Sequence, residues 1–344
     1  MKVLVTGCLG YIGTVLVPLL HKEGHEVFGL DSDIYRRCTF SGAIPEFPVT
    51  RKDVRDVTQD ELAGFDAIIH LAGLSNDPLG DYRPELTEEI NEKASITLAV
   101  KAKAAGVKRF LFASSCSNYG AAGADFLTEE AKFNPVTPYG VSKVQVEVAL
   151  SRLADENFSP TYLRASTAYG VSPRIRFDLV TNNLTAWAFT TGLVYIKSDG
   201  TPWRPIVHVE DISRAYIAVL HAPREVVHNE GFNVGTTSEN YQVREIAQLV
   251  KEVVPGCKVE YAPDAGPDKR CYRVDCNKIT RTLHDFKPQW TARRGVEQLY
   301  EEYKRVGLTL EEFEGPKFMR IAHVKSLINE GVLDENLRWR DGKK

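Results

Sequence analysis

Short apolar runs alternate with longer segments of helical spacing along the first half of the chain. The apolar runs predict strands at residues 2–6, 26–31, 66–71, 109–114 and 161–164. The segments between them predict helices at residues 11–22, 85–105 and 138–157. Strands that alternate with helices pair in parallel, so this half of the chain predicts a doubly wound α/β sheet.

This alternation ends after about residue 165, where prolines interrupt shorter elements. Helical patterns at 178–191, 210–222 and 243–253 are separated by strand candidates at Val194, Phe232 and Val259. We therefore expect residues 1–165 to form a nucleotide-binding domain with some later segments interleaved. Residues 166–344 should form a smaller substrate lobe and a tail that is helical and amphipathic from Gly295 onward.

A glycine-rich turn follows the first predicted strand. The sequence VLVTGCLGYIG places Gly7, Gly10 and Gly13 between that strand and the first helix. A dinucleotide pyrophosphate needs close backbone approach and free N–H groups at a helix N-terminus, and glycines permit both. The spacing is GxxGxxG rather than GxGxxG, and three glycines alone also fit a plain turn. Their position between a strand and a helix favours the dinucleotide site.

An acidic residue ends the second predicted strand. Asp31 follows the turn by about 20 residues, where a carboxylate can accept hydrogen bonds from the adenosine ribose and would repel a 2′-phosphate. This favours NAD over NADP, although Arg36 and Arg37 leave NADP open because arginines can bind that phosphate. Asp53 and Val54 are candidate adenine contacts, and Asp53 fits a solvated turn equally well.

A tyrosine and a lysine share one face of the helix predicted after Pro138. Tyr139 and Lys143 lie four positions apart in YGVSK. An unperturbed tyrosine has a pKa of about 10 and is a poor base, but a nearby ammonium group favours the phenolate. The serines of SSCSNYG end the preceding strand, where a hydroxyl can share the proton with the tyrosine. A YxxxK pair is common on surfaces, and its place in a nucleotide-binding pattern favours catalysis.

Together these motifs resemble the extended short-chain dehydrogenase/reductases, the NAD-dependent nucleotide-sugar epimerase/dehydratase family. The resemblance covers roughly residues 1–300 and rests on TGCLGYIG, Asp31, IIHLAG, Asn91, SSCSNYG, YGVSK, NNL and RPIVHVED. It implies a Rossmann-like doubly wound parallel sheet with a smaller C-terminal substrate lobe. It also implies NAD as the cofactor and a nucleotide sugar as the substrate. Asp31 and a redox-neutral reaction predict that the NAD is held tightly.

The resemblance also implies roles for individual residues. The catalytic set is Ser115, Tyr139 and Lys143, with Tyr139 as the base. The cofactor-binding residues are Gly7, Gly10, Tyr11, Ile12, Gly13, Asp31, Asp53, Val54, Leu71, Ala72, Gly73, Asn91, Tyr139 and Lys143. The substrate-binding residues are Ser75, Ser117, Thr167, Asn183, Arg204, Asp268 and Arg270. Asn183 and Arg204 are expected at the diphosphate, which the planar guanidinium fork suits.

Two positions after the catalytic serine depart from part of this family. The sugar 4,6-dehydratases carry an Asp-Glu pair there and the decarboxylases tend to carry a glutamate, whereas this chain has Cys116 and Ser117. The galactose-type 4-epimerases have small or hydroxyl residues there, so we expect a 4-epimerase acting through C4 oxidation. A 4-oxidase or ketoreductase and a dehydratase remain alternatives. A non-catalytic NAD-binding sensor is a further alternative, and the intact set of catalytic residues argues against it.

Three further positions bear on the substrate and the acid/base group. Thr167 stands where an asparagine is usual, and Ala265 stands where 4-epimerases often have arginine, which points to an uncommon sugar. Some 3,5-epimerising members use a cysteine as acid/base one position closer to the tyrosine. Because the register differs, we expect Cys116 to be a packed thiol.

Composition and charge exclude several other classes. The 344 residues are 43% hydrophobic and 26% charged with a net charge of −3, which is ordinary for a globular enzyme and gives no basic field for nucleic acid. No apolar run of about 18 residues occurs, and the N-terminus lacks a signal-peptide pattern, so we expect a cytoplasmic protein without membrane spans. The 6 cysteines lack CxxC spacing, so we expect free thiols and no metal site. Relatives pair the two long helices into a four-helix bundle, so we expect a homodimer.

Overall fold

The computed structural model describes residues 1–44, 46–75, 79, 82–266 and 271–340, without the side chains of 121–124 and 263–266. Its centre is a parallel sheet of seven strands in the order β11-β7-β5-β4-β1-β2-β3. These strands are β1 (Lys2–Thr6), β2 (Glu26–Asp31), β3 (Val49–Arg51), β4 (Ala67–His70), β5 (Arg109–Ser115), β7 (Ser159–Ala165) and β11 (Glu230–Val234). The predicted doubly wound α/β fold is confirmed.

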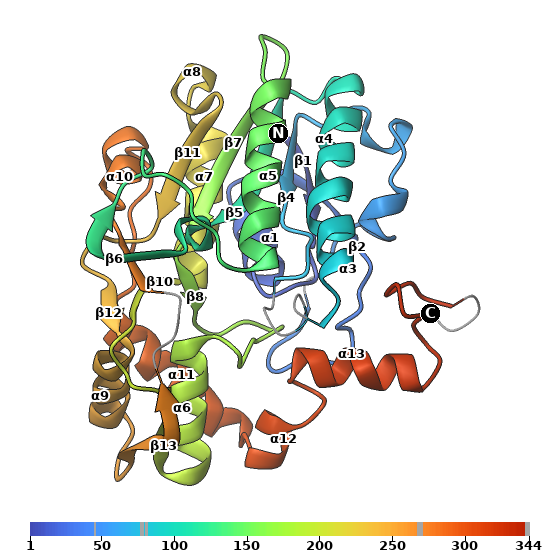
Figure 1. Cartoon of the computed structure of the whole chain (residues 1–344). Coiled ribbons are helices and arrows are strands. Elements are labelled where there is room, and N and C mark those ends of the chain that lie inside the picture. Colours follow the sequence, from blue (N-terminus) through green and yellow to red (C-terminus); the bar gives the residue numbers. More distant parts are fainter. Residues whose placement is uncertain (45, 76–78, 80–81, 267–270, 341–344) are drawn as a thin grey trace.

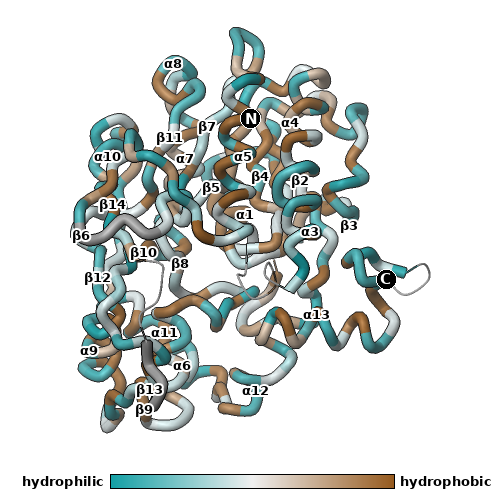
Figure 2. The backbone as a smooth tube through the Cα atoms, in the orientation of Figure 1, coloured by the Kyte–Doolittle hydropathy of each residue, from teal (hydrophilic) through white to brown (hydrophobic). Residues whose placement is uncertain are grey.

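Helices cover both faces of this sheet, which explains why its strands read as continuous apolar runs (Figure 1). Alternate strand residues enter opposite layers. Val3 and Val5 pack with α1 (Gly13–Lys22) and α7 (Val209–His221), and Leu4 packs with α4 (Ala94–Ala104) and α5 (Pro138–Leu153) on the other side. Figure 2 shows hydrophobic and hydrophilic positions alternating along these helices. The sheet therefore has a buried core on each face.

The helix predicted at residues 85–105 is divided into three pieces. It begins with α3 (Pro84–Thr87), widens into the π-helical turn η3 (Glu88–Lys93) and continues as α4. Asn91 lies in the wide turn, and its side chain bonds both backbone groups of Leu74 at 2.6 and 2.9 Å. The helix thus holds the loop that follows β4.

Outside the central sheet, the described residues form three short sheets, and we call this part of the structure the smaller lobe. Their strands are β8 (Thr167–Tyr169), β10 (Trp203–His208) and β12 (Asn240–Gln242); β9 (Leu193–Ser198) and β13 (Lys258–Gly266); β6 (Ala121–Leu127) and β14 (Cys271–Val274). The larger helices beside them are α6 (Val180–Thr191), α9 (Val243–Val253) and α11 (Ala292–Val306). The remaining short helices are α8 (Arg224–Val227), α10 (Asn277–Thr282), α12 (Leu310–Glu314), η1 (Val54–Asp56), η2 (Asp60–Leu62) and η4 (Cys116–Tyr119).

Two later segments return from the smaller lobe to the main sheet. The segment containing α7 and β11 completes one end of the sheet beside β7. The C-terminal helix α13 (Arg320–Asn329) and the residues after it lie on the side of β2, where the Trp339 indole donates to the Ser32 carbonyl at 2.5 Å. Figure 1 shows this tail in red, apart from the helices of the smaller lobe. In the part of the chain that the structure describes, no helix is long and apolar enough to cross a bilayer.

Candidate functional site

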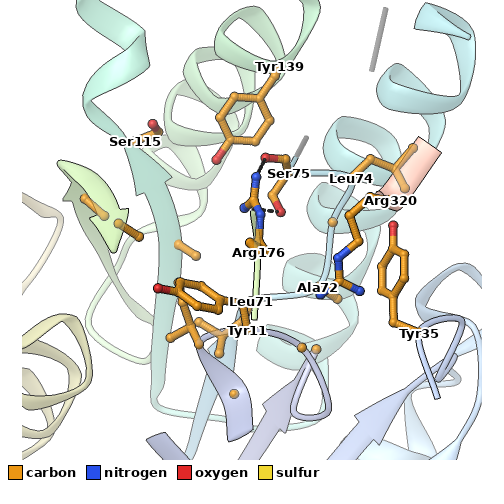
Figure 3. Close-up of a pocket in the computed structure, with 18 of the residues that line it drawn as sticks. Tyr11, Tyr35, Leu71, Ala72, Leu74, Ser75, Ser115, Tyr139, Arg176 and Arg320 are labelled. Atoms are coloured by element: carbon orange, nitrogen blue, oxygen red, sulfur yellow. Dashed lines mark hydrogen bonds between the residues drawn. The ribbon is translucent and has the colours of Figure 1, made fainter. Parts of the chain in front are cut away.

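A cavity of about 740 Å³ opens over the carboxyl ends of the central strands. The strand order changes direction between β1 and β4, which is where a doubly wound sheet leaves a crevice for ligands. Figure 3 shows part of its wall. The predicted site residues that line it are Gly7, Gly10, Tyr11, Ile12, Gly13, Asp31, Asp53, Val54, Leu71, Ala72, Gly73, Ser75, Ser115, Ser117, Tyr139, Lys143, Thr167 and Arg204.

The glycine turn leaves no room for side chains. Gly7 has a φ of +72°, and a Cβ added there would stand 2.7 Å from the backbone nitrogen of Ala72. A Cβ on Gly13 would stand 2.5 Å from two carbonyl oxygens of the turn. Helix α1 begins at Gly13, and its N-cap residue supplies no side-chain hydrogen bond. The turn therefore presents bare backbone and the positive end of a helix to the cavity, which fits the pyrophosphate of a dinucleotide.

Two carboxylates mark the end of the cavity at β2. Asp31 accepts hydrogen bonds from the N–H groups of Leu9 at 2.9 Å and Asp33 at 2.7 Å. Burial nevertheless raises the pKa of Asp31 above its usual value. Asp33, with φ at +53°, pairs with Arg51 at 3.0 Å and with Arg174 at 3.4 Å. This acidic end suits a ribose with free hydroxyls and opposes a 2′-phosphate.

The two arginines that kept NADP open point elsewhere. The Arg36 guanidinium lies 4.4 Å from the centre of the Trp339 ring, and Arg37 pairs with Glu330 at 2.8 Å. Neither residue lines the cavity. Both side chains hold the C-terminal tail, so the structure removes this objection to NAD.

Tyr139 and Lys143 reach the cavity from the first turns of α5. Thr137 caps this helix by accepting from the Gly140 N–H at 3.1 Å, and Pro138 occupies its first position. The Lys143 ammonium lies 5.4 Å from the centre of the Tyr139 ring and 4.7 Å from that of Phe112. Burial lowers the pKa of Lys143 to about 8, so it remains mostly protonated at neutral pH. A cation therefore stands beside the phenol.

Ser115 lies at the end of β5 and faces the same space as Tyr139 (Figure 3). Its hydroxyl donates to the Ser117 hydroxyl at 3.0 Å and accepts from the Ser117 N–H at 3.1 Å. Cys116, between them, is fully buried and donates to the Arg164 carbonyl at 3.1 Å. Burial raises the pKa of the Cys116 thiol to about 12, so this thiol is packed and outside the cavity wall, as expected.

Arg176 and Asp178 line the cavity but were not among the predicted residues. The Arg176 guanidinium donates to the Ser75 hydroxyl at 3.0 Å and to the Ser75 carbonyl at 2.8 Å. It also pairs with Asp178 at 2.6 Å. Figure 3 shows it between Tyr139 and Tyr11. The only sequence signal was the run RIRFD, which reads as a solvated charged segment.

Four predicted site residues do not line the cavity in the structure or lie outside the described residues. Asn91 does not line the cavity, because both ends of its amide are engaged by Leu74. Asn183 is also outside the wall, and its amide donates to the Phe177 carbonyl at 2.8 Å. Asp268 and Arg270 lie outside the described residues. Among the described residues, no group of three or more His, Cys, Asp or Glu side chains has the arrangement of a metal site.

Comparison with known proteins gives concordant matches. The model of the NAD dependent epimerase/dehydratase family matches residues 3–235. The UDP-glucose 4-epimerase of Lactobacillus helveticus is 30% identical over 317 residues, covering 84% of this chain and 92% of that protein. The UDP-glucose 4-epimerase of Corynebacterium glutamicum is 26% identical over 312 residues, covering 86% and 93%. The solved structure of MoeE5 in complex with UDP-glucuronic acid and NAD is 28% identical, with a TM-score of 0.77 over 89% of this chain and 99% of that one.

Proposed function

This chain belongs to the NAD-dependent epimerase/dehydratase family, whose cofactor is NAD, and we propose that it is a nucleotide-sugar 4-epimerase that works through transient oxidation at C4. One observation carries the choice of reaction. Ser115, Tyr139 and Lys143 meet in one cavity with the glycine turn, and neither residue after Ser115 brings a carboxylate to it. The acidic residues that other family members use for dehydration or decarboxylation have no counterpart at these positions.

The carboxylates of the described cavity wall support this choice. They are Asp31, Asp33, Asp53 and Asp178. The first three stand at the ends of β2 and β3, away from Tyr139, and Asp178 is held by the Arg176 guanidinium. Removal of a proton from a sugar carbon needs a carboxylate or comparable base next to that carbon. Beside Ser115 and Tyr139 the described wall presents hydroxyl groups, together with Asp178 in its ion pair with Arg176.

The proposed chemistry assigns the proton at C4 to Tyr139. Bound NAD+ supplies the hydride acceptor. The Tyr139 hydroxyl takes the proton of the sugar hydroxyl, and the Lys143 cation favours the phenolate that does so. Lowering a tyrosine pKa from about 10 to about 7 needs roughly 4 kcal/mol of differential stabilisation. Ser115, already polarised through Ser117, shares the same proton.

Inversion at C4 requires the oxidised sugar to present its other face. The described side chains on the proposed sugar side include Ser75, Ser117 and Thr167, which are short and carry hydroxyls. Such a wall offers hydrogen bonds without filling the space that a turning sugar needs. Arg204 is buried and lines the cavity from β10 of the smaller lobe. We assign it, with Asp268 and Arg270, to the nucleotide and its diphosphate.

A panel of nucleotide sugars tests this proposal. We would test UDP-hexoses and UDP-hexuronates first, because two relatives are named UDP-glucose 4-epimerases and the similar MoeE5 structure holds UDP-glucuronic acid. GDP, CDP and dTDP sugars would follow. We expect one of them to give its C4 epimer without net formation of NADH. Mass spectrometry and NMR of the sugar identify the product. Net NADH with a keto product would identify an oxidase, and a product lighter by one water would identify a dehydratase. Binding of NAD without turnover of any sugar would favour the sensor.

We also propose that the protein is a homodimer that pairs through α4 and α5. The two helices pack side by side, and they expose Val100, Val141 and Val148 to the extent of 47%, 42% and 41%. Light scattering at micromolar concentration should give twice the 38.5 kDa of one chain. Val148→Asp should shift the mass towards one chain, and a wild-type mass of one chain would contradict the dimer.

The cysteines support a cytoplasmic location, which we propose as well. All six are free thiols, and Cys271 alone among them is more than slightly exposed. A reducing compartment keeps such thiols unpaired. Fractionation of the source cells with an antibody against the chain should find it with cytoplasmic markers, and recovery outside the cytoplasm would contradict this.

A further inference from the structure

A buried arginine from the C-terminal tail lines the cavity. Arg320 is the first residue of α13 and is 5% exposed. Its Nη2 donates to the carbonyls of Arg174 at 3.0 Å and Ile175 at 3.4 Å, and its guanidinium lies 3.8 Å from the centre of the Tyr35 ring. Figure 3 shows the stack of Arg320 on Tyr35.

The other terminal nitrogen of this guanidinium has no hydrogen-bond partner among the described residues. Nη1 of Arg320 is buried and makes no hydrogen bond to any described atom. Within the described residues, no carboxylate lies within ion-pair distance of Arg320. A buried cation without a counter-ion is unfavourable, and burial lowers the pKa of Arg320 from its usual value. An anion in the cavity that Arg320 lines would supply the missing negative charge.

The contacts of Arg320 join it to segments at both ends of the cavity. Tyr35 comes four residues after Asp31, which marks the expected ribose-binding end. The Arg174 and Ile175 carbonyls directly precede Arg176 in the chain, and Arg176 contacts Ser75. The Arg174 guanidinium also donates to the Leu9 carbonyl of the glycine turn at 3.3 Å. Arg320 is therefore joined to the glycine turn through Arg174 and lies beside Tyr35 in the cavity wall. In NAD, the only anionic group between the two nucleosides is the pyrophosphate.

We propose that Arg320 binds the pyrophosphate of NAD, and that the tail from residue 320 to residue 340 is a clasp over the bound cofactor. This inference rests on NAD as the cofactor and is independent of the reaction at C4. Arg320 would complete the anion site, because the glycine turn supplies backbone N–H groups and the tail supplies a guanidinium.

Further contacts fasten the clasp to the adenosine end of the cavity. Leu337 is 2% exposed and lines the cavity, where it packs with Val54 in one apolar cluster. The Asn336 carbonyl accepts from Arg55 at 2.9 Å, and Arg55 also pairs with Asp53 at 2.6 Å. The tail thus closes over the two loops that would hold adenosine. Release of NAD requires these contacts to open, so the clasp predicts slow exchange of the cofactor.

Arg320→Gln is the variant that tests the assignment. Glutamine removes the charge and can still donate to the Arg174 carbonyl, so it preserves much of the local packing. We expect the Kd of NAD, measured by calorimetry on protein stripped of cofactor, to rise about 10- to 100-fold, the range of one charge-assisted hydrogen bond. The matched control is Arg305→Gln, since Arg305 pairs with Glu302 at 2.7 Å on α11, outside the tail, and does not line the cavity. Its Kd should stay within about twofold of the wild type.

Two further measurements separate binding from a structural role and locate the contact. NAD should raise the Tm of Arg320→Gln less than that of the wild type, whereas a structural role would lower both melting temperatures equally. The affinity for ADP-ribose should fall with that for NAD, and the affinity for adenosine, which lacks the pyrophosphate, should not. Wild-type NAD affinity in Arg320→Gln would overturn the proposal. An equal loss for adenosine, or a loss confined to the nucleotide sugar, would also overturn it.

Discussion

The two ends of the cavity are assembled in different ways. At the catalytic end, Ser115 comes from SSCSNYG and Tyr139 and Lys143 come from YGVSK, two short motifs on adjoining elements. At the adenosine end, the wall combines Asp31, Asp53 and the tail residue Leu337, which are far apart along the chain. The difference teaches that the proposed catalytic residues lie in short sequence motifs, whereas the proposed adenosine-binding residues come together only through tertiary packing. Changes at the two ends should therefore affect different measured quantities.

The largest effect is expected from Lys143→Met, which acts on both quantities. The substitution removes the cation beside Tyr139 and, with it, a side chain that the family resemblance places among the cofactor-binding residues. Turnover should fall by at least about 10⁴-fold, the upper range for loss of general-base function. The affinity for NAD should fall as well. Single-turnover NADH absorbance and NAD calorimetry measure the two losses, and an effect on only one of them would break the proposed double role.

Tyr139→Phe should separate chemistry from binding. The ring and its packing remain while the hydroxyl disappears, so turnover should drop about 10²- to 10⁴-fold with NAD affinity unchanged. Ser115→Ala should fall between this variant and the wild type, because Ser115 only shares the proton. Steady-state turnover on the best sugar of the panel measures both. A Tyr139→Phe enzyme with wild-type turnover would remove Tyr139 from the proton chemistry.

The elements that carry Ser115, Tyr139 and Lys143 could be predicted from the sequence because their signals are short-range. The central strands and the helix after Pro138 follow from apolar runs and from capping at Thr137. Strand β3 was missed because it has three residues and no apolar run. The wide turn at Glu88–Lys93 was missed because the helical pattern continues through it. Arg320 was missed because only the folded chain brings it to Tyr35, and nothing in its neighbourhood of the sequence marks a ligand.

Asp31→Asn tests the adenosine end of the cavity, where we expect a change in NAD affinity and no change in turnover. The amide can no longer accept from both N–H groups of Leu9 and Asp33, and it carries no charge against a 2′-phosphate. We expect the Kd of NAD to rise about 10-fold, in line with a hydrogen bond to a charged group, and discrimination against NADP to weaken. Turnover at saturating NAD should stay near the wild-type value. A fall in turnover with unchanged NAD affinity would contradict the separation of the two ends.

Cys116→Ala should have the smallest effect on catalysis. The thiol is buried and bonded to the Arg164 carbonyl, outside the cavity wall. Its loss should lower the free energy of unfolding by about 1 kcal/mol, as ordinary buried substitutions do. Turnover should be unchanged within the error of the assay, with urea unfolding as the second measurement. Loss of turnover in a folded Cys116→Ala protein, together with an active Tyr139→Phe, would move the proton chemistry to Cys116.

The central claim is that the sugar is oxidised and reduced at C4 within one active site. The most direct test is a nucleotide sugar that carries deuterium at C4, incubated with the enzyme in ordinary water. The account predicts a C4 epimer that retains the deuterium at C4, seen by NMR and mass spectrometry, because hydride leaves and returns without exchange. A product that has lost the deuterium to water, or that is unchanged at C4 and altered elsewhere on the ring, would contradict it.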